Sequence, residues 1–260
     1  MNLQNEKLVL EVKKKREFSQ LSDSIIERVL NLSKIKNLSD EESKIKESRA
    51  TLRKYFGVFL TNRVLKEKKF EKGEFESVLK SHKSSQKRDY LELYKKILSD
   101  ENSILDLGAG VNGFSYYIIE RVLKRKIDYV AFEGVGQLVN KMNAYFTENK
   151  LFNAKAIQGD LFDINGIIEI LLKQKKPRTV FMFQIIDALE FLERDFSKEL
   201  ILEVSKNCEK IVLSFPLGSL GRQTRFKAKR YWILNFLEQN FLIRDSFILN
   251  GERFVVFRKV

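Results

Sequence analysis

Apolar residues in the first hundred positions recur at intervals of three and four residues, the spacing of one face of an α-helix. The pattern is clearest in the run Leu21, Ile25, Ile26, Val29, Leu30 and Leu32. Ser39 followed three residues later by Glu42 matches a capping box and predicts a helix start within the polar stretch 38–49. Two further helices are expected at 51–66 and 74–98, with Lys72-Gly73 between them. We therefore predict that residues 1–98 form an all-helical region.

From Ser103 onward, short β-rich apolar runs alternate with amphipathic stretches. The runs are SILDL, DYVAFE, AKAIQ, RTVFMFQ and KIVLSF, and the alternation is typical of βαβ units and a parallel sheet. After a last helix near 225–240, the runs FLIRDSFIL and RFVVFRK are joined across Asn250-Gly251, a strong hairpin signal. Residues 99–260 are predicted to form an α/β domain with a seven-stranded, Rossmann-like sheet whose C-terminal hairpin is antiparallel. Class I methyltransferases are built in this way.

The composition is that of a globular protein. Of 260 residues, 43% are hydrophobic and 32% are charged, which is enough to bury a core. No window offers the roughly 18 uncharged apolar residues of a membrane helix. Charged residues interrupt any secretory signal at the N-terminus, and the one cysteine, Cys208, cannot form an intrachain disulfide. We expect a cytoplasmic protein without a membrane segment and, because no His/Cys cluster has metal-ligand spacing, without a metal cofactor.

The charge is strongly positive. Against 35 Asp+Glu stand 48 Lys+Arg, a formal net charge of +13 that attracts polyanions, nucleic acid first among them. The first hundred residues are the more basic part per residue. Lysine-rich helices with solvated faces would give the same excess, so the charge alone does not establish RNA binding.

The segment from Ile104 to Gly110 is a buried strand that runs into a glycine turn, and we expect a helix to start near Gly113. Glycines are needed where the backbone closes on a ligand in an unusual conformation. Asp106, at the carboxyl end of the strand, can receive the ammonium of an amino-acid-bearing ligand such as S-adenosylmethionine. The stretch 108–113 also satisfies GxGxxG, the dinucleotide fingerprint, and Glu133 follows at the distance of a ribose-binding acid.

Three features favour S-adenosylmethionine over a dinucleotide. Asp106 precedes the first glycine by two residues, the terminal hairpin suits the methyltransferase fold, and Gly159-Asp160-Leu161 supplies an acid where adenine would lie. A dehydrogenase would also need an acid/base in a substrate domain, and the only histidine, His82, precedes the cofactor domain. The alternative for the whole set is structural: acids that cap helices and glycines that only turn the chain.

Four separated stretches resemble the aminoglycoside-resistance 16S rRNA (guanine-N7) methyltransferases. Ser81-His82-Lys83-Ser84-Ser85-Gln86-Lys87-Arg88 is similar to the family's His-x-Ser-Thr-x-Glu-Arg segment, with Lys87 in place of Glu. The ILDLGAG turn keeps Asn112 but has Gly113 where the family has Pro. Residues 184–190, QIIDALE, resemble a Lys-x-Leu-Pro-x-Leu-Glu segment, and 214–222, SFPLGSLGR, resemble Ser-Phe-Pro-x-x-Ser-Leu-Gly-Gly-Arg with one glycine fewer.

The resemblance implies a class I methyltransferase that methylates N7 of a guanine in the decoding region of small-subunit rRNA, within the 30S subunit. It assigns Arg88 to the carboxylate of S-adenosylmethionine, whose product form is S-adenosylhomocysteine. Guanine N7 carries a lone pair and no proton, so direct in-line transfer requires alignment and no general base. We therefore predict no catalytic acid or base.

The predicted site residues fall into three groups. Those expected to bind the cofactor are Arg88, Asp106, Gly108, Ala109, Gly110, Glu133, Asp160, Leu161 and Gln184. Candidates to stack on an unstacked base are Phe215, Tyr231 and Trp232. Candidates to bind RNA phosphates, besides the basic N-terminal region, are Arg222, Arg225, Lys227, Lys229 and Arg230.

Two alternatives stay open at this point. The same fold and charge would serve a methyltransferase of another RNA or of adenine N1. A non-catalytic RNA-binding ribosome-assembly protein would share the charge but lack a working cofactor site.

Overall fold

The computed structural model describes residues 3–55, 75–81, 85–217 and 230–260. Within them a seven-stranded sheet has the order β3-β2-β1-β4-β5-β7-β6. Its strands are β1 (Ser103–Leu107), β2 (Asp128–Glu133), β3 (Ala154–Gln158), β4 (Arg178–Phe183), β5 (Lys210–Pro216), β6 (Phe241–Leu249) and β7 (Glu252–Lys259). The first five strands are parallel, and β7 is antiparallel to both β5 and β6. The predicted sheet and hairpin are confirmed.

The hairpin turn has the backbone that its sequence predicts. Asn250 has φ 50° and Gly251 has φ 82°, so both central residues are left-handed, as a two-residue turn that matches the twist of its strands requires.

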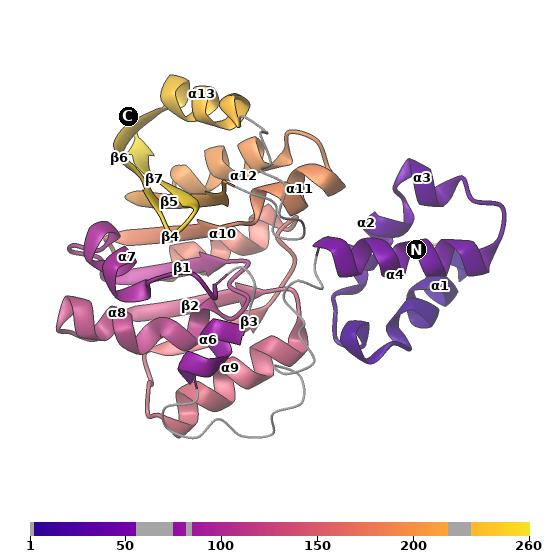
Figure 1. Ribbon diagram of the computed structural model, residues 1–260, viewed down its shortest axis with the longest axis horizontal. Helices are drawn as coiled ribbons and strands as arrows, with labels where there is room; N and C mark the ends of the chain where they lie inside the picture. The colour runs from indigo at the N-terminus through magenta and orange to yellow at the C-terminus, as the bar shows by residue number, and fades with distance from the viewer. Residues whose placement is uncertain (1–2, 56–74, 82–84, 218–229) are drawn as a thin grey trace.

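Helices cover both faces of the sheet, which makes three layers (Figure 1). One face packs on α7 (Tyr90–Ile97), α8 (Tyr116–Leu123) and α9 (Gly136–Glu148). The other packs on α10 (Ile164–Leu172), α11 (Ile186–Leu192), α12 (Phe196–Ser205) and α13 (Tyr231–Asn240). Successive residues of β1 alternate between these faces: Ile104 belongs to the first core, and Leu105 and Leu107 belong to the second. Asp106 therefore points into the layer of α7, α8 and α9.

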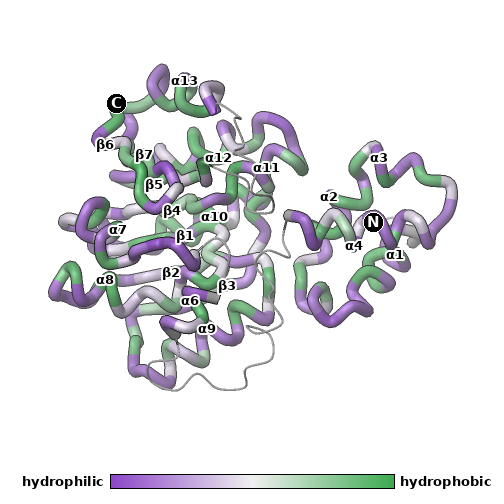
Figure 2. Tube along the Cα trace, in the orientation of Figure 1, coloured by the Kyte–Doolittle hydropathy of each residue, from purple (hydrophilic) through white to green (hydrophobic). Residues whose placement is uncertain are grey.

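The N-terminal helices form a group of their own beside the sheet (Figure 1). They are α1 (Leu3–Lys13), the short 3₁₀ helix η1 (Arg16–Phe18), α2 (Asp23–Leu30), α3 (Ser33–Lys36) and α4 (Glu41–Tyr55). Hydrophilic and hydrophobic segments alternate along them (Figure 2). Most of their apolar residues, such as Ile26 and Leu52, are buried, whereas Leu10 is exposed. In contrast, α6 (Phe75–Ser81) and α7 pack on the sheet domain, against the 3₁₀ helix η3 (Asn112–Ser115) and α8.

Helix boundaries in this region differ from the prediction. The capping residue of α4 is Asp40, whose Oδ1 accepts a 2.7 Å hydrogen bond from the Ser43 amide; Ser39 does not cap it. No helix starts at position 51, because α4 continues past it to Tyr55. Thr51 is buried, and its hydroxyl accepts a hydrogen bond from Lys34 on α3. Most of the helix predicted at 51–66 lies outside the described residues.

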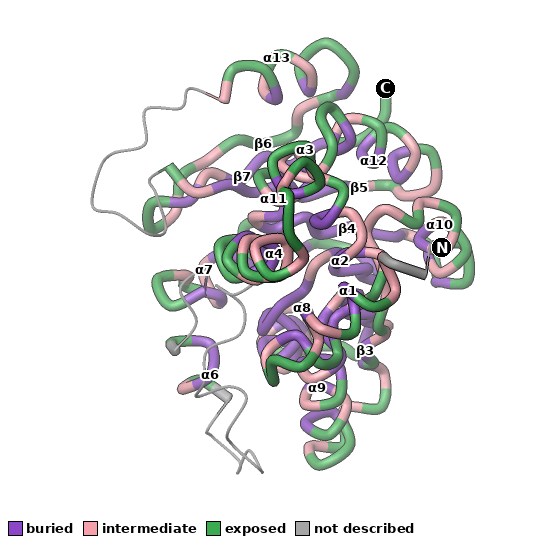
Figure 3. The backbone as a smooth tube through the Cα atoms, turned by 90° about the vertical axis from the view of Figure 1, so that its right-hand side faces the viewer, coloured by how far each residue is buried: buried purple, intermediate pink, exposed green. Residues whose placement is uncertain are grey.

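The single helix predicted at 74–98 is wrong, because α6 ends at Ser81 and α7 starts at Tyr90. The Asp89 side chain caps α7 by accepting from the Glu92 amide at 3.0 Å, which fixes a new helix start. The helix expected near Gly113 is also different, because η3 comes first and α8 starts at Tyr116. Exposed residues lie on the outer turns of α9 and α13 (Figure 3).

Candidate cofactor site

The glycine turn after β1 is tied to the end of β2. Gly108 and Gly110 have φ of 65° and 55°, left-handed values that favour glycine. The amides of Gly108 and Ala109 donate to the Phe132 carbonyl at 2.8 and 3.1 Å. A side chain at Gly108 would place its Cβ 2.6 Å from Ile185 Cγ2, so the turn has no room for one.

A small cavity opens beside this turn, at the carboxyl edge of the parallel strands. It is partly open to solvent and measures about 60 Å³. Five predicted residues line it: Gly108, Glu133, Asp160, Leu161 and Gln184. The other lining residues were not among the predicted site residues: Ile25, Gly134, Gly159, Phe162, Ile185, Ala188, Leu189 and Leu192. Of these, Gly159, Ile185, Ala188 and Leu189 belong to the motifs quoted above. The open α/β folds bind ligands at this edge.

Glu133, at the end of β2, braces the turn from the cavity side. Its Oε2 accepts a 2.8 Å hydrogen bond from the Gly110 amide, and its Oε1 accepts one from the Val135 amide at 3.0 Å. The side chain is buried, and burial raises the pKa of this carboxyl above its ordinary value. Each oxygen keeps a lone-pair direction that a ligand hydroxyl can use.

The loop after β3 forms the opposite wall. Asp160 Oδ1 accepts a 3.0 Å hydrogen bond from the Phe162 amide, which shapes the loop. Gly159 lets this loop approach β2, because a Cβ there would lie 2.1 Å from the ring of Phe132. Gln184, after β4, has φ 58°, and its amide donates to the Ser214 carbonyl at 3.0 Å.

Asp106 is buried behind the turn, with only 1% of its surface exposed. Its Oδ2 accepts hydrogen bonds from Asn112 Nδ2 at 2.5 Å and from the Tyr129 hydroxyl at 2.6 Å. Its Oδ1 is buried and has no hydrogen-bond partner among the described residues. Burial raises the pKa of Asp106 to about 6, against the effect of both hydrogen bonds and of the nearby Arg88 charge. A buried carboxylate oxygen without a donor is costly, and a ligand cation would satisfy it.

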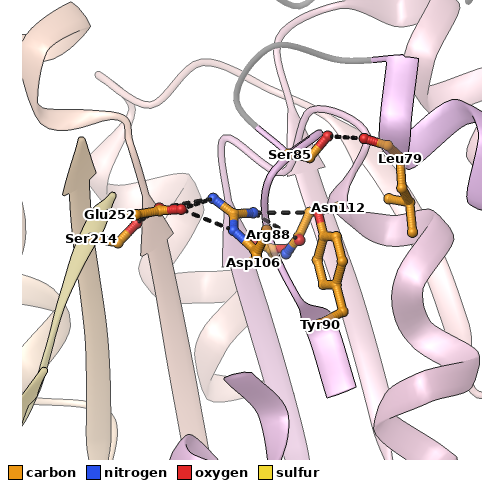
Figure 4. Close-up of polar contacts among 8 residues, drawn as sticks. All are labelled: Leu79, Ser85, Arg88, Tyr90, Asp106, Asn112, Ser214 and Glu252. Atoms are coloured by element: carbon orange, nitrogen blue, oxygen red, sulfur yellow. Dashed lines mark hydrogen bonds and ion pairs between the residues drawn. The ribbon is translucent and has the colours of Figure 1, made fainter. Parts of the chain in front are cut away.

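Arg88 lies next to this group, in the segment that leads into α7 (Figure 4). Its Nη2 and Nε donate to the Glu252 carboxylate on β7, at 2.8 Å to Oε1 and 3.1 Å to Oε2. Its Nη1 lies 3.3 Å from both the Tyr90 hydroxyl and Asn112 Oδ1. Burial lowers the pKa of Arg88, but the charge of the Glu252 carboxylate and the hydrogen bonds to it act in the opposite direction, and the pKa of Arg88 is raised above its ordinary value. In this arrangement Glu252 pairs with the Arg88 guanidinium, which the resemblance assigns to the cofactor carboxylate.

Helix α2 of the N-terminal group supplies one wall of the cavity. Ile25 lines it, and Ile25 Cδ1 would lie 2.9 Å from a Cβ on Gly134. A backbone hydrogen bond also joins the segment before α2 to the start of α9, because the Gly136 amide donates to the Gln20 carbonyl at 2.9 Å. Sequence patterning could not predict this contact, since it places Ile25 on the apolar face of a helix without saying what that face covers.

The three aromatic candidates differ in exposure. Phe215 is 3% exposed, and the Arg230 guanidinium lies 5.1 Å from its ring centroid, so a base could reach the ring only if Arg230 moved. Tyr231 and Trp232, at the start of α13, are 56% and 39% exposed.

Of the five cations predicted to bind RNA, only Arg230 falls within the described residues. Its Nη2 donates to Asp187 at 2.6 Å, and its side chain is 9% exposed. Arg222, Arg225, Lys227 and Lys229 lie outside the described residues, as do His82 and Ser84.

Neither a metal site nor a membrane helix is found where the structure describes the chain. No group of three or more His, Cys, Asp or Glu side chains there could hold a metal ion. No helix in those ranges is long and apolar enough to cross a membrane.

The sheet order separates the two interpretations of the glycine turn. A dinucleotide fold continues with parallel strands in the order 3-2-1-4-5-6, whereas here antiparallel β7 lies between β5 and β6. The third glycine also serves a packing role, because a Cβ on Gly113 would lie 2.5 Å from Met142 Sδ on α9.

Solved structures with the same fold include three rRNA methyltransferases. The 16S rRNA methyltransferase RmtF, solved with S-adenosyl-L-homocysteine, matches with a TM-score of 0.74 at 15% identity over 100% of both chains. An rRNA methylase from Escherichia coli matches with a TM-score of 0.75 at 16% identity, over 98% of this chain and 100% of that one. The 16S rRNA methylase RmtB matches with a TM-score of 0.71 at 16% identity over 98% of each chain.

No protein-family model matches the chain, and no curated protein sequence is significantly similar to it. The structural likeness at these identities establishes the fold. It extends over 98–100% of this chain, so the methyltransferase fold expected from the alternating strand and helix runs and the terminal hairpin is confirmed.

Proposed function

We propose that this protein is an S-adenosylmethionine-dependent methyltransferase that acts on 16S rRNA, at N7 of a guanine in the decoding region of the small subunit. The observation that carries the proposal is the placement of Asp106. Its buried Oδ1, which has no hydrogen-bond partner among the described residues, lies behind a left-handed glycine turn, and that turn borders a cavity whose walls include Glu133 and Asp160.

The residues fit this cofactor part by part. Asp106 Oδ1 would accept the ammonium of the methionine moiety, Glu133 would accept from ribose hydroxyls, and the Asp160-Leu161 loop would hold the adenine. S-adenosylmethionine, when bound, supplies an electrophilic methyl group. The cavity of about 60 Å³ is smaller than the cavity of about 150 Å³ that holds a benzene ring. We expect its apolar walls, such as Ile25 and Leu192, to move apart when the adenosyl group binds.

RNA as the substrate is supported by charge and by architecture. The net charge of +13 attracts a polyanion. The similarity to RmtF and RmtB includes the N-terminal helices, which are not part of the sheet domain. We propose that the N-terminal group α1–α4, residues 3–55, supplies the main RNA-docking region and that the sheet domain, on which α6 and α7 pack, supplies the methyltransferase domain, with the basic segment 222–230 as a second contact.

The chemistry of guanine N7 suits the groups at the site. N7 attacks with a lone pair and loses no proton, so the protein has to align the base with the methyl group and exclude water. The two ionisable side chains on the cavity wall, Glu133 and Asp160, each hold a backbone amide, so neither is arranged as a free base. Exposed Tyr231 and Trp232 would stack on the unstacked guanine.

Calorimetric titration with S-adenosylhomocysteine tests the cofactor site. We expect saturable binding by the wild type and loss of binding in Asp106→Asn, with exposed Asp195→Asn as the matched control that binds normally. If the wild type does not bind S-adenosylhomocysteine, either on its own or in the presence of 30S subunits, the non-catalytic RNA-binding alternative replaces this proposal.

Methylation of 30S subunits and of naked 16S rRNA with labelled S-adenosylmethionine tests the substrate. N7-methylguanosine is located by strand cleavage with borohydride and aniline, whereas N1-methyladenosine stops reverse transcription. A reverse-transcription stop at an adenine without cleavage would favour the adenine N1 alternative. RNA affinity should also fall steeply as salt rises, and salt-insensitive binding would contradict docking through the basic surfaces.

A further inference from the structure

A chain of hydrogen bonds leads from the last strand of the sheet to Asp106 (Figure 4). Glu252, at the start of β7, accepts from Arg88 at 2.8, 3.0 and 3.1 Å, and the Ser214 hydroxyl donates to Glu252 from β5. Arg88 Nη1 donates to Asn112 Oδ1 at 3.3 Å, and Asn112 Nδ2 donates to Asp106 Oδ2 at 2.5 Å. Glu252 is therefore linked to the Asp106 carboxylate through Arg88 and Asn112, although the two acids lie more than a hundred positions apart in the sequence.

The direction of every hydrogen bond in this chain is fixed by chemistry. A guanidinium can only donate, and an ionised carboxylate can only accept. The amide of Asn112 must therefore turn its oxygen to Arg88 and its nitrogen to Asp106. Together with the Tyr129 hydroxyl, this occupies Oδ2 and leaves Oδ1 of Asp106 available for a cation.

The ion pair at the far end is sealed from solvent. The side chains of Arg88 and Glu252 are 4% and 8% exposed. The Arg88 guanidinium carbon lies 5.0, 5.5 and 6.0 Å from the ring centroids of Phe183, Tyr90 and Phe254. Removing one member of a buried pair leaves an uncompensated charge, so a cofactor carboxylate cannot replace Glu252 at low cost.

We propose that Glu252 is a positioning residue of the cofactor site, which holds Arg88 on Asn112 and away from the Asp106 oxygen that receives the cofactor ammonium. The inference rests on the proposed function. Without the Glu252 charge, Arg88 still lies close to the buried Asp106 carboxylate and would pair with it. The cofactor ammonium would then compete with an internal cation.

The test compares two ligands that differ at the amino-acid end. S-adenosylhomocysteine has the ammonium, and 5′-methylthioadenosine keeps the adenosine and thioether but has neither ammonium nor carboxylate. In Glu252→Gln we expect the affinity for S-adenosylhomocysteine to fall on the order of tenfold, the effect of one charged hydrogen bond. The affinity for 5′-methylthioadenosine should not change.

The matched control is Glu101→Gln. Glu101 is also buried, at 1% exposure, and pairs with Lys210 close to Ile97, away from the cofactor cavity. We expect it to lower the thermal midpoint, as loss of a buried pair does, and to leave the ratio of the two affinities at the wild-type value. If Glu252→Gln does not fold, Glu252→Asp keeps the charge on a shorter side chain and should give a smaller loss confined to S-adenosylhomocysteine.

The outcomes separate the two proposals. Equal losses for both ligands, or no loss for either, would show that Glu252 only stabilises the fold and would overturn the inference. Failure of the wild type to bind either ligand would instead contradict the proposed function.

Discussion

The guanidinium of Arg28 lies 3.9 Å from the centroid of the Phe162 ring. Arg28 belongs to α2 of the N-terminal group, and Phe162 lines the cofactor cavity from the loop after β3. The same guanidinium donates to Glu193 at 2.8 Å, just beyond α11. One N-terminal side chain thus joins two walls of the cavity, which couples the position of the proposed RNA-docking region to the cofactor.

Arg28→Ala should weaken cofactor binding without unfolding the protein. The cation–π contact and the exposed ion pair each contribute about 1 kcal/mol or less, so we expect a several-fold faster dissociation of S-adenosylhomocysteine. Stopped-flow displacement measures that rate. Arg53→Ala is the control, because Arg53 makes the same two kinds of contact, with Phe18 and Glu17, entirely within the N-terminal group. An equal change in both variants would argue against the coupling.

Gly108→Ala should abolish cofactor binding and lower stability. The new Cβ meets Ile185 Cγ2 at 2.6 Å in a left-handed backbone, so both overlap and strain oppose it. Strain alone costs roughly 1–2 kcal/mol. Gly251→Ala isolates that part, because its φ is 82° and nothing lies within 4 Å of its Cβ. The difference between the two thermal midpoints measures the overlap; identical midpoints would mean that Ile185 yields freely.

Asp106→Asn should stabilise the protein while it removes the ammonium acceptor. The pKa of Asp106 rises from 3.8 to about 6 in the folded state, so the folded protein favours the protonated form. Its contribution to stability is complete below pH 3.8 and is lost as the pH rises through about 6. Ionisation at neutral pH then costs about 3 kcal/mol. We expect a thermal midpoint a few degrees higher at pH 7.5; a lower midpoint would show that the carboxylate is satisfied in a way that this structure lacks.

The glycine turn and the acids at the carboxyl ends of β1, β2 and β3 could be predicted from sequence, because parallel strands bring these ends to one edge. Gly108, Glu133, Asp160, Leu161 and Gln184 meet at one cavity for that reason. Local spacing also predicted the hairpin at Asn250-Gly251, since its two-residue turn needs residues that tolerate positive φ.

The rest depends on contacts between distant segments, which no local pattern encodes. Glu252 has the sequence context of an ordinary strand residue, and only the fold brings it to Arg88. Ile25 looked like a core position of a helix, and its role as a wall of the cavity follows from its approach to Gly134, just after β2. The helix boundaries were wrong where a side chain decided them: Asp40 and Asp89 cap helices that periodicity alone would have placed elsewhere.

Cofactor affinity should depend on pH through Asp106. The charged and polar groups that surround it are Arg88, Tyr90, Tyr94, Tyr129, Asn112 and Glu133. Because only the ionised carboxylate attracts an ammonium, affinity for S-adenosylhomocysteine should be constant above the pKa of about 6 and fall up to tenfold per pH unit below it. Titrations between pH 5 and pH 8 measure this profile. The affinity for 5′-methylthioadenosine should stay flat; a parallel fall would mean that another group titrates.

Trp232→Ala should impair methyl transfer to RNA and leave the cofactor bound. Trp232 is 39% exposed at the start of α13, next to the chain segment 218–229 that connects it to β5. Stacking of a base on an aromatic ring contributes about 1–3 kcal/mol, so kcat/KM on 30S subunits should fall roughly tenfold or more.

Phe152→Ala is the control, because that ring is 79% exposed on the loop before β3, away from the cavity. Trp232 also lies 5.4 Å from Lys198 Nζ, so Trp232→Phe, which keeps a ring, should retain most activity. Equal activity of Trp232→Ala and wild type would remove Trp232 from the RNA site and leave Tyr231 as the exposed candidate.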